Sequence, residues 1–155
     1  MEAGNDPLAV IEALAEHEET LGALYAAYSD LFPTAQELWR TLSSEEYGHA
    51  ALLRSLPKQT DELAAFVDAR RFRLDEVRSE TERLRSAVRT APFAGVGLLG
   101  AFRTAIKLED GLIESQVFTV AEDDSPAIAA ALTSLAEATE GHRRHLSQSF
   151  SGTSH

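Results

Sequence analysis

Four segments of the chain carry apolar residues spaced alternately three and four apart, which is the pattern of a helix that buries one face. The segments lie at about residues 7–30, 34–56, 97–122 and 126–148. They are rich in Ala, Leu, Glu and Arg, which favour helices, and Pro7, Pro33 and Pro126 stand at or beside three of the expected helix starts. No stretch alternates in the manner of a strand. The sequence therefore predicts an all-α fold.

The connection between the second and third segments is long, whereas the connection within each pair is short. It contains an amphipathic stretch of its own at about residues 73–90, whose charged faces we interpret as solvated rather than as a binding surface. Two antiparallel helix hairpins joined by one long crossover are a known form of the antiparallel four-helix bundle. We therefore expect a single domain over residues 1–155, with the bundle at about 7–150.

Each predicted helix seam is apolar except near its middle. At that level the four helices present the polar residues Glu18, Glu46, His49, Glu109, Thr139 and His142. A buried carboxylate costs several kcal/mol unless a partner compensates its charge. Carboxylates and neutral imidazoles on facing helices are suitable ligands for iron or manganese, and a Glu-x-x-His pair such as Glu46 and His49 directs both side chains to one helix face. The pattern predicts a metal site in the centre of the bundle.

A purely structural interpretation of the same residues stays open. A single Glu–His pair can lie at the solvent-exposed end of a bundle, or it can be buried and form hydrogen bonds within the protein. Agreement among four helices at one level favours the metal site. The spacing of Glu46 and His49 also recurs in Thr139 and His142, which indicates a repeated helix hairpin.

The composition narrows the range of partners. The chain has 14 Lys and Arg against 25 Asp and Glu, and its net charge of −11 disfavours nucleic-acid phosphates and anionic membrane surfaces. It has no cysteine for a disulfide, a zinc knuckle or a thiolate iron site. We find neither a signal peptide nor an apolar stretch long enough to span a bilayer, so we expect a cytoplasmic protein. The motif "GVGLLG" at 95–100 has the letters of a dinucleotide-binding loop, but no strand precedes it, and we interpret it as the start of the third helix.

The chain over about residues 7–150 resembles the ferritin-like superfamily, and within it the rubrerythrin-like di-iron carboxylate proteins. The stretch "LAEHEETLGALY" is similar to the first helix of the family, in which a ligand glutamate is followed seven residues later by a tyrosine, here Glu18 and Tyr25. The stretch "PTAQELWRTLSSEEYGHAALL" is similar to the second helix, with Trp39 at its aromatic position and Glu46-x-x-His49 as its metal motif.

The second half of the chain resembles the family less completely. The stretches "TAIKLEDGLIESQVF" and "LTSLAEATEGHRRHL" are similar to the third and fourth helices, which implies Glu109 and His142 as ligands. In the family the fourth helix also carries a glutamate that bridges two metals together with the one matched by Glu46, but Thr139 stands at that position here. The resemblance thus leaves open two metals with water or hydroxide in the gap, one metal, or none.

The resemblance implies a non-haem iron protein that binds one or two Fe ions, with Mn as an alternative. It further implies oxidation of Fe(II) by peroxide or oxygen, and a homodimer, which is usual in the family. The chain has no cysteine for the rubredoxin-like module that often supplies electrons in this family. Two other hypotheses remain open: a metal-free helical bundle that serves as a binding or assembly module, and metal storage or sensing without turnover.

The sequence also predicts the positions of several residues outside the set of candidate ligands. His17 is expected at the surface, because it lies about a quarter-turn off the seam, and His145 at the flank of the bundle. We interpret Gly48 and Gly141, which each precede a histidine, as making room for a neighbouring backbone or a bulky side chain. The buried tyrosines are expected to pack and to form hydrogen bonds. The small polar tail at 147–155 is expected to fray.

Overall fold

The computed structural model of the protein describes residues 6–56, 74–111 and 126–153. Within these ranges the backbone forms five α-helices and no strand. The helices are α1 (Pro7–Leu31), α2 (Gln36–Arg54), α4 (Leu74–Thr90), α5 (Leu98–Glu109) and α7 (Pro126–Thr153). Short 3-10 turns at Pro33–Ala35 and Ala91–Phe93 precede α2 and follow α4. The prediction of an all-α fold is confirmed for the described residues.

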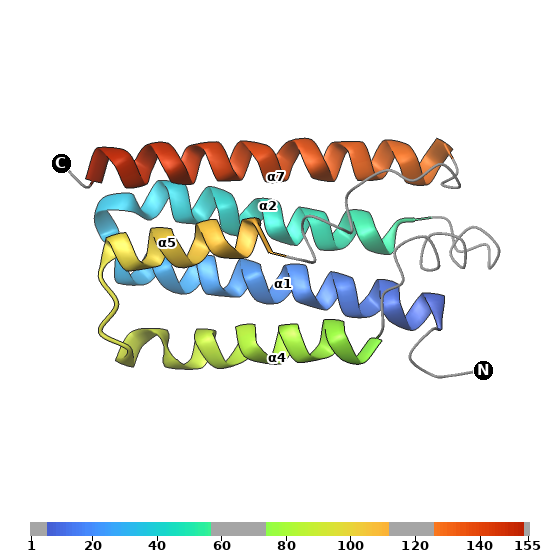
Figure 1. Cartoon of the computed structure of the whole chain (residues 1–155), viewed down its shortest axis with the longest axis horizontal. Coiled ribbons are helices and arrows are strands. Elements are labelled where there is room, and N and C mark those ends of the chain that lie inside the picture. The colour runs from blue at the N-terminus through green and yellow to red at the C-terminus, as the bar shows by residue number, and fades with distance from the viewer. Residues whose placement is uncertain (1–5, 57–73, 112–125, 154–155) are drawn as a thin grey trace.

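The five helices all lie along the long axis of the molecule (Figure 1). Helix α1 packs against α2 and α4, and α7 packs against α5 and α2. Helices α1, α4 and α7 run in one direction, whereas α2 and α5 run in the other (Figure 1). Helix α4 therefore returns the chain from the end of the molecule at which α2 stops to the end at which α5 starts. None of the described helices is both long and apolar enough to cross a membrane.

The helix boundaries follow the proline signals closely. Helix α1 begins at Pro7, and the Asp6 carboxylate accepts a hydrogen bond from the backbone N–H of Leu8 at 3.2 Å, as an N-cap should. The amphipathic stretch expected at 73–90 is helix α4. The third expected helix is observed as α5, and the part of that prediction beyond residue 111 lies outside the described residues.

The C-terminal segment differs from its prediction. Helix α7 continues to Thr153, so the expectation that the tail frays is wrong for residues 147–153. The aromatic ring of Phe150 packs against the apolar core, and the guanidinium of Arg103 lies 5.3 Å from its centroid. Small polar residues alone would not keep the end of α7 helical, so we attribute its stability to these contacts with α5 and the core.

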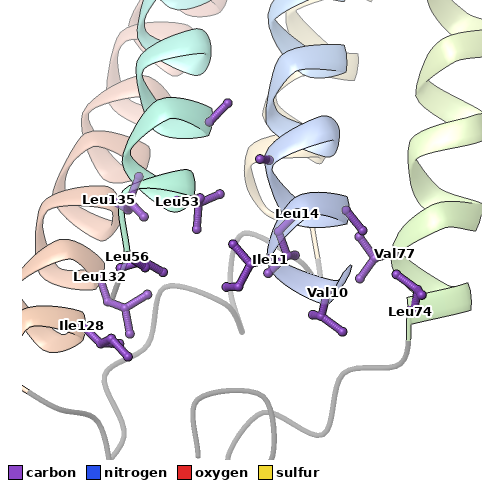
Figure 2. Close-up of a cluster of buried hydrophobic side chains, with 13 residues drawn as sticks. Val10, Ile11, Leu14, Leu53, Leu56, Leu74, Val77, Ile128, Leu132 and Leu135 are labelled. Atoms are coloured by element: carbon purple, nitrogen blue, oxygen red, sulfur yellow. The ribbon is translucent and has the colours of Figure 1, made fainter. Parts of the chain in front are cut away.

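The buried apolar side chains form two clusters, one toward each end of the molecule. The first apolar cluster lies where α1 begins and α2 ends, and Figure 2 labels its larger members, which are Val10, Ile11, Leu14, Leu53, Leu56, Leu74, Val77, Ile128, Leu132 and Leu135. The second apolar cluster contains Leu21, Leu24, Tyr25, Tyr28, Trp39, Leu42, Leu84, Phe102 and Leu146. Along α1, α2 and α7, the buried residues between the two clusters are polar.

Candidate metal centre

The structure brings all five predicted ligand residues together between the two apolar clusters. We call them the polar layer: Glu18, Glu46, His49, Glu109 and His142. Every one of them is buried. They come from α1, α2, α5 and α7. They lie at one height along these helices, as the positions of the polar residues in the apolar seams predict. The apolar side chains above and below separate the polar layer from water at both ends of the molecule.

The polar layer divides into two overlapping groups of three residues. In each group, every residue offers one potential ligand atom, and the three atoms lie within 4.8 Å of one another. The first group is Glu18, Glu46 and His49, and the second group is Glu46, Glu109 and His142. Glu46 belongs to both, so its two carboxylate oxygens can serve two neighbouring positions.

The first group is organised around a single turn of α2. His49 Nδ1 lies 3.1 Å from Glu46 Oε2, as the Glu-x-x-His spacing requires. Burial, together with repulsion from the nearby His142, whose ring centroid is 5.5 Å away, outweighs the attraction of Glu109 and Glu45 and lowers the pKa of His49 to about 4. At neutral pH the imidazole of His49 is therefore uncharged, which is the form that binds a metal.

The second group has a different electrostatic state. His142 Nδ1 lies 3.1 Å from Glu46 Oε1 and 3.2 Å from Glu109 Oε1. Burial by itself lowers the pKa of His142, but hydrogen bonds and charge attraction from Glu109 and Glu45 outweigh it and raise the pKa to about 8. The hydroxyl of Tyr25 donates to Glu109 Oε1 at 2.8 Å, which fixes that carboxylate in place. Without a metal, His142 is thus an imidazolium ion at neutral pH.

Two residues near the polar layer depart from the expectations for the helix seams. Glu45 lies outside the predicted ligand residues, yet its Oε2 contacts the Nε2 atom of His142 from the outer side. His17 was expected at the surface, which is wrong, because its side chain is only 3% exposed. Burial lowers the pKa of His17 to about 4 against the attraction of Glu109. Helix α1 packs against α4 as well as α2, so a position a quarter-turn off the first seam is still covered.

A signal for the burial of His17 was present in the sequence. An amphipathic α4 must cover a second apolar face, and α1 offers one in Val10, Ala13 and Leu24, which share with His17 a spacing of three, four and seven residues. No comparable signal marks Glu45, because its contact with His142 depends on how α2 and α7 are placed.

The prediction that Gly48 and Gly141 make room for a neighbouring group is wrong. A Cβ atom at Gly48 or Gly141 would have no neighbour within 4 Å, so neither glycine makes room for a close approach. The close approach occurs at Gly22, where a Cβ would lie 3.2 Å from the carbonyl oxygen of Ser43. The Ser43 hydroxyl also donates to the Gly22 carbonyl oxygen at 2.7 Å. Gly22 therefore allows α1 and α2 to approach one another beside the polar layer.

The remaining predictions around the site agree with the structure. Thr139 is buried on α7 within one turn of His142, whereas Glu137 and Glu140 are exposed and point off the seam. His145 is exposed at the flank. Neither three-residue group includes a carboxylate from α7, because Thr139 occupies the position one turn before His142.

The donor set fits a divalent cation. Three buried carboxyl groups lie beside two imidazole rings, and a cation among them would offset the cost of burying carboxylates. Glu109 Oε2 is buried and accepts no hydrogen bond from any residue that the structure describes, and such an atom costs free energy unless a donor or a cation reaches it. Carboxylate oxygens combined with imidazole nitrogens suit iron and manganese better than calcium or magnesium, which prefer oxygen ligands alone.

Comparison with known proteins does not extend this picture. No family model matches the chain, and neither a curated protein nor a solved structure matches it. What the polar layer does must therefore be inferred from its own residues.

Proposed function

We propose that the protein is a ferritin-like four-helix bundle of the rubrerythrin-like type, and that its polar layer binds one or two iron ions. The observation that carries this proposal is the pair of three-residue groups that share Glu46. Each group places two carboxylates and one imidazole at close range, which is a donor set suited to iron or manganese. Burying three carboxylates without a cation would also be costly.

The roles of the residues follow from their geometry. Glu18, Glu46 and His49 would hold one ion, and Glu46, Glu109 and His142 would hold a second. Bound iron would supply the exchange of electrons with peroxide or oxygen. The protein's contribution is to neutralise positive charge with carboxylates and to exclude bulk water by means of the two apolar clusters. Tyr25 keeps the Glu109 carboxylate oriented through its hydrogen bond.

A metal-free helical module is the second candidate, and one observation favours it. The imidazolium of His142 already lies at ion-pair distance from Glu46 and Glu109, and it contacts Glu45 from the outer side. This network compensates part of the buried negative charge without a metal. The two candidates differ in whether Fe(II) binds tightly enough to displace the proton of His142.

An anaerobic Fe(II) titration of the metal-free protein tests the proposal. We expect saturable binding of one to two ions per chain and a rise in the melting temperature, because an ion that binds only the native state stabilises it. Glu18→Gln should weaken binding, whereas the exposed Glu137→Gln is the matched control and should not. Absence of saturable binding in the unaltered protein would exclude the metal function and leave the metal-free module.

Addition of peroxide or oxygen to the Fe(II)-loaded protein then separates an oxidoreductase from a storage or sensing protein. Repeated oxidation over many equivalents of Fe(II), followed by ultraviolet absorption, would support turnover. A single stoichiometric oxidation, or none, would support storage or sensing.

A further inference from the structure

Glu45 connects the surface of α2 to the buried ring of His142. Its side chain is 47% exposed, and its Oε2 contacts the Nε2 atom of His142 on α7. The opposite nitrogen of the same ring, Nδ1, faces Glu46 Oε1 at 3.1 Å and Glu109 Oε1 at 3.2 Å. The imidazole is thus held between one outer carboxylate and two inner carboxylates, and the consecutive residues Glu45 and Glu46 contact its two nitrogens from one helix.

The two nitrogens of an imidazole cannot act independently when one of them binds a metal. The metal takes the lone pair of one nitrogen, so the other nitrogen of the neutral ring carries the proton. A carboxylate that accepts a hydrogen bond from that N–H fixes the tautomer, orients the ring and increases the basicity of the nitrogen that faces the metal.

The carboxylates around the two histidines differ. His49 has Glu46 one turn earlier on its own helix, at 3.1 Å. The corresponding residue before His142 is Thr139, which has no carboxylate. In the described parts of the chain, no carboxylate outside the polar layer makes a direct contact with His49 comparable to that of Glu45 with His142.

We propose that Glu45 is the positioning residue of His142. It accepts a hydrogen bond from the Nε2–H group, and this leaves the Nδ1 lone pair directed at the metal position between Glu46 and Glu109. Glu45 does not itself bind the ion. The inference rests on the proposed metal function and adds to it an outer carboxylate from α2, on the side of the His142 ring opposite Glu46 and Glu109.

Three forms of the full chain test this assignment: the unaltered protein, Glu45→Ala and Glu45→Gln, with the exposed Glu137→Gln as the control. Each is titrated with Zn²⁺, a diamagnetic probe that allows nuclear magnetic resonance of the histidine nitrogens. In the unaltered protein we expect the proton of His142 on Nε2, with slow exchange against solvent. In Glu45→Ala this proton should exchange faster, and the affinity for the second ion should fall about ten- to a hundredfold, while the first ion is little affected.

Glu45→Gln should restore part of the slow exchange, because its amide oxygen still accepts a hydrogen bond, although it lacks the charge. A merely structural role for Glu45 would change neither the protonated nitrogen nor the difference between the two ions. If the zinc-loaded protein carried the proton of His142 on Nδ1, the ion would be on the Glu45 side and the inference would be overturned. If the unaltered protein bound two ions and Glu45→Ala matched it in affinity and proton exchange, the inference alone would fail. Absence of binding to the unaltered protein would overturn the proposed function and this inference together.

Discussion

The two three-residue groups of the polar layer contain the same residue types, but their histidines differ in charge at neutral pH. His49 is neutral because burial dominates its environment, and its pKa is lowered to about 4. His142 is buried as well, yet Glu109 and Glu45 raise its pKa to about 8. The first group is therefore already in the form that binds a cation, whereas the second group must first release a proton. The residue types in a group therefore do not by themselves determine how readily it binds a cation.

Removal of the shared residue should have the largest effect. Glu46→Gln takes a charged ligand from both groups at once, so we expect the dissociation constants for both ions to rise at least about 100-fold. Calorimetric titration with Fe(II) or Mn(II) would measure this loss. If one ion still bound with unchanged affinity, Glu46 would not be shared and the two groups would be independent sites.

Restoring a carboxylate on α7 should make the two groups more alike. Thr139→Glu adds a buried negative charge one turn before His142, so the metal-free protein should lose roughly 3 kcal/mol in its free energy of unfolding. Fe(II) should reverse the loss and bring the stoichiometry closer to two ions per chain. Urea denaturation with and without Fe(II) measures both effects. A variant that is destabilised and not rescued by metal would show that position 139 does not face the metal site.

The histidines should contribute unequally at neutral pH. His49→Ala should weaken binding about tenfold more than His142→Ala, because His142 must lose a proton at a cost of about 1 kcal/mol at pH 7. Metal analysis of the two variants, prepared side by side, would reveal the difference. Equal losses would contradict the inequality of the two groups, and negligible losses in both would favour the metal-free module.

The stability of the metal-free protein should change in opposite directions on either side of pH 6.5. The raised pKa of His142 contributes stability below about pH 6.5, and this contribution is lost as the pH rises through about 8. The lowered pKa values of His17 and His49 act oppositely: between pH 6.5 and about 4 the unfolded chain binds more protons, so stability falls on acidification.

Urea denaturation across this pH range, in the presence of a chelator, would measure both changes, which should reach about 2 kcal/mol on the alkaline side and about 3 kcal/mol for each of the two histidines on the acid side. The acid slope should become shallower in His17→Gln, whereas the alkaline slope should disappear in His142→Gln. A His17→Gln protein with the same acid slope as the unaltered chain would mean that His17 is not held neutral by burial.

The sequence was sufficient to predict the five residues of the polar layer, because helical periodicity alone decides which side chains face a common axis. Glu18, Glu46 and His142 each replace one apolar residue in an otherwise regular pattern. The same reasoning failed for His17, whose burial depends on α4 packing against a second face of α1. It also failed for Glu45, which lies outside the seam and reaches His142 only because of the placement of α2 beside α7.

Gly22 has a consequence for the size of ion that the first group can accept. It lies one turn after Glu18, and its partner Ser43 lies one turn before Glu46, so the separation of α1 and α2 at this point sets the distance between the two carboxylates. A Cβ here would meet the Tyr47 ring at 3.0 Å and the Ser43 carbonyl oxygen at 3.2 Å, so these neighbours on α2 would have to move away from α1 by a few tenths of an ångström. Metal–oxygen bonds of about 2.0–2.2 Å distinguish small ions from Ca²⁺, whose bonds are about 2.3–2.6 Å long. In the proposed metal site, the absence of one methyl group on α1 would thus favour ions of small radius.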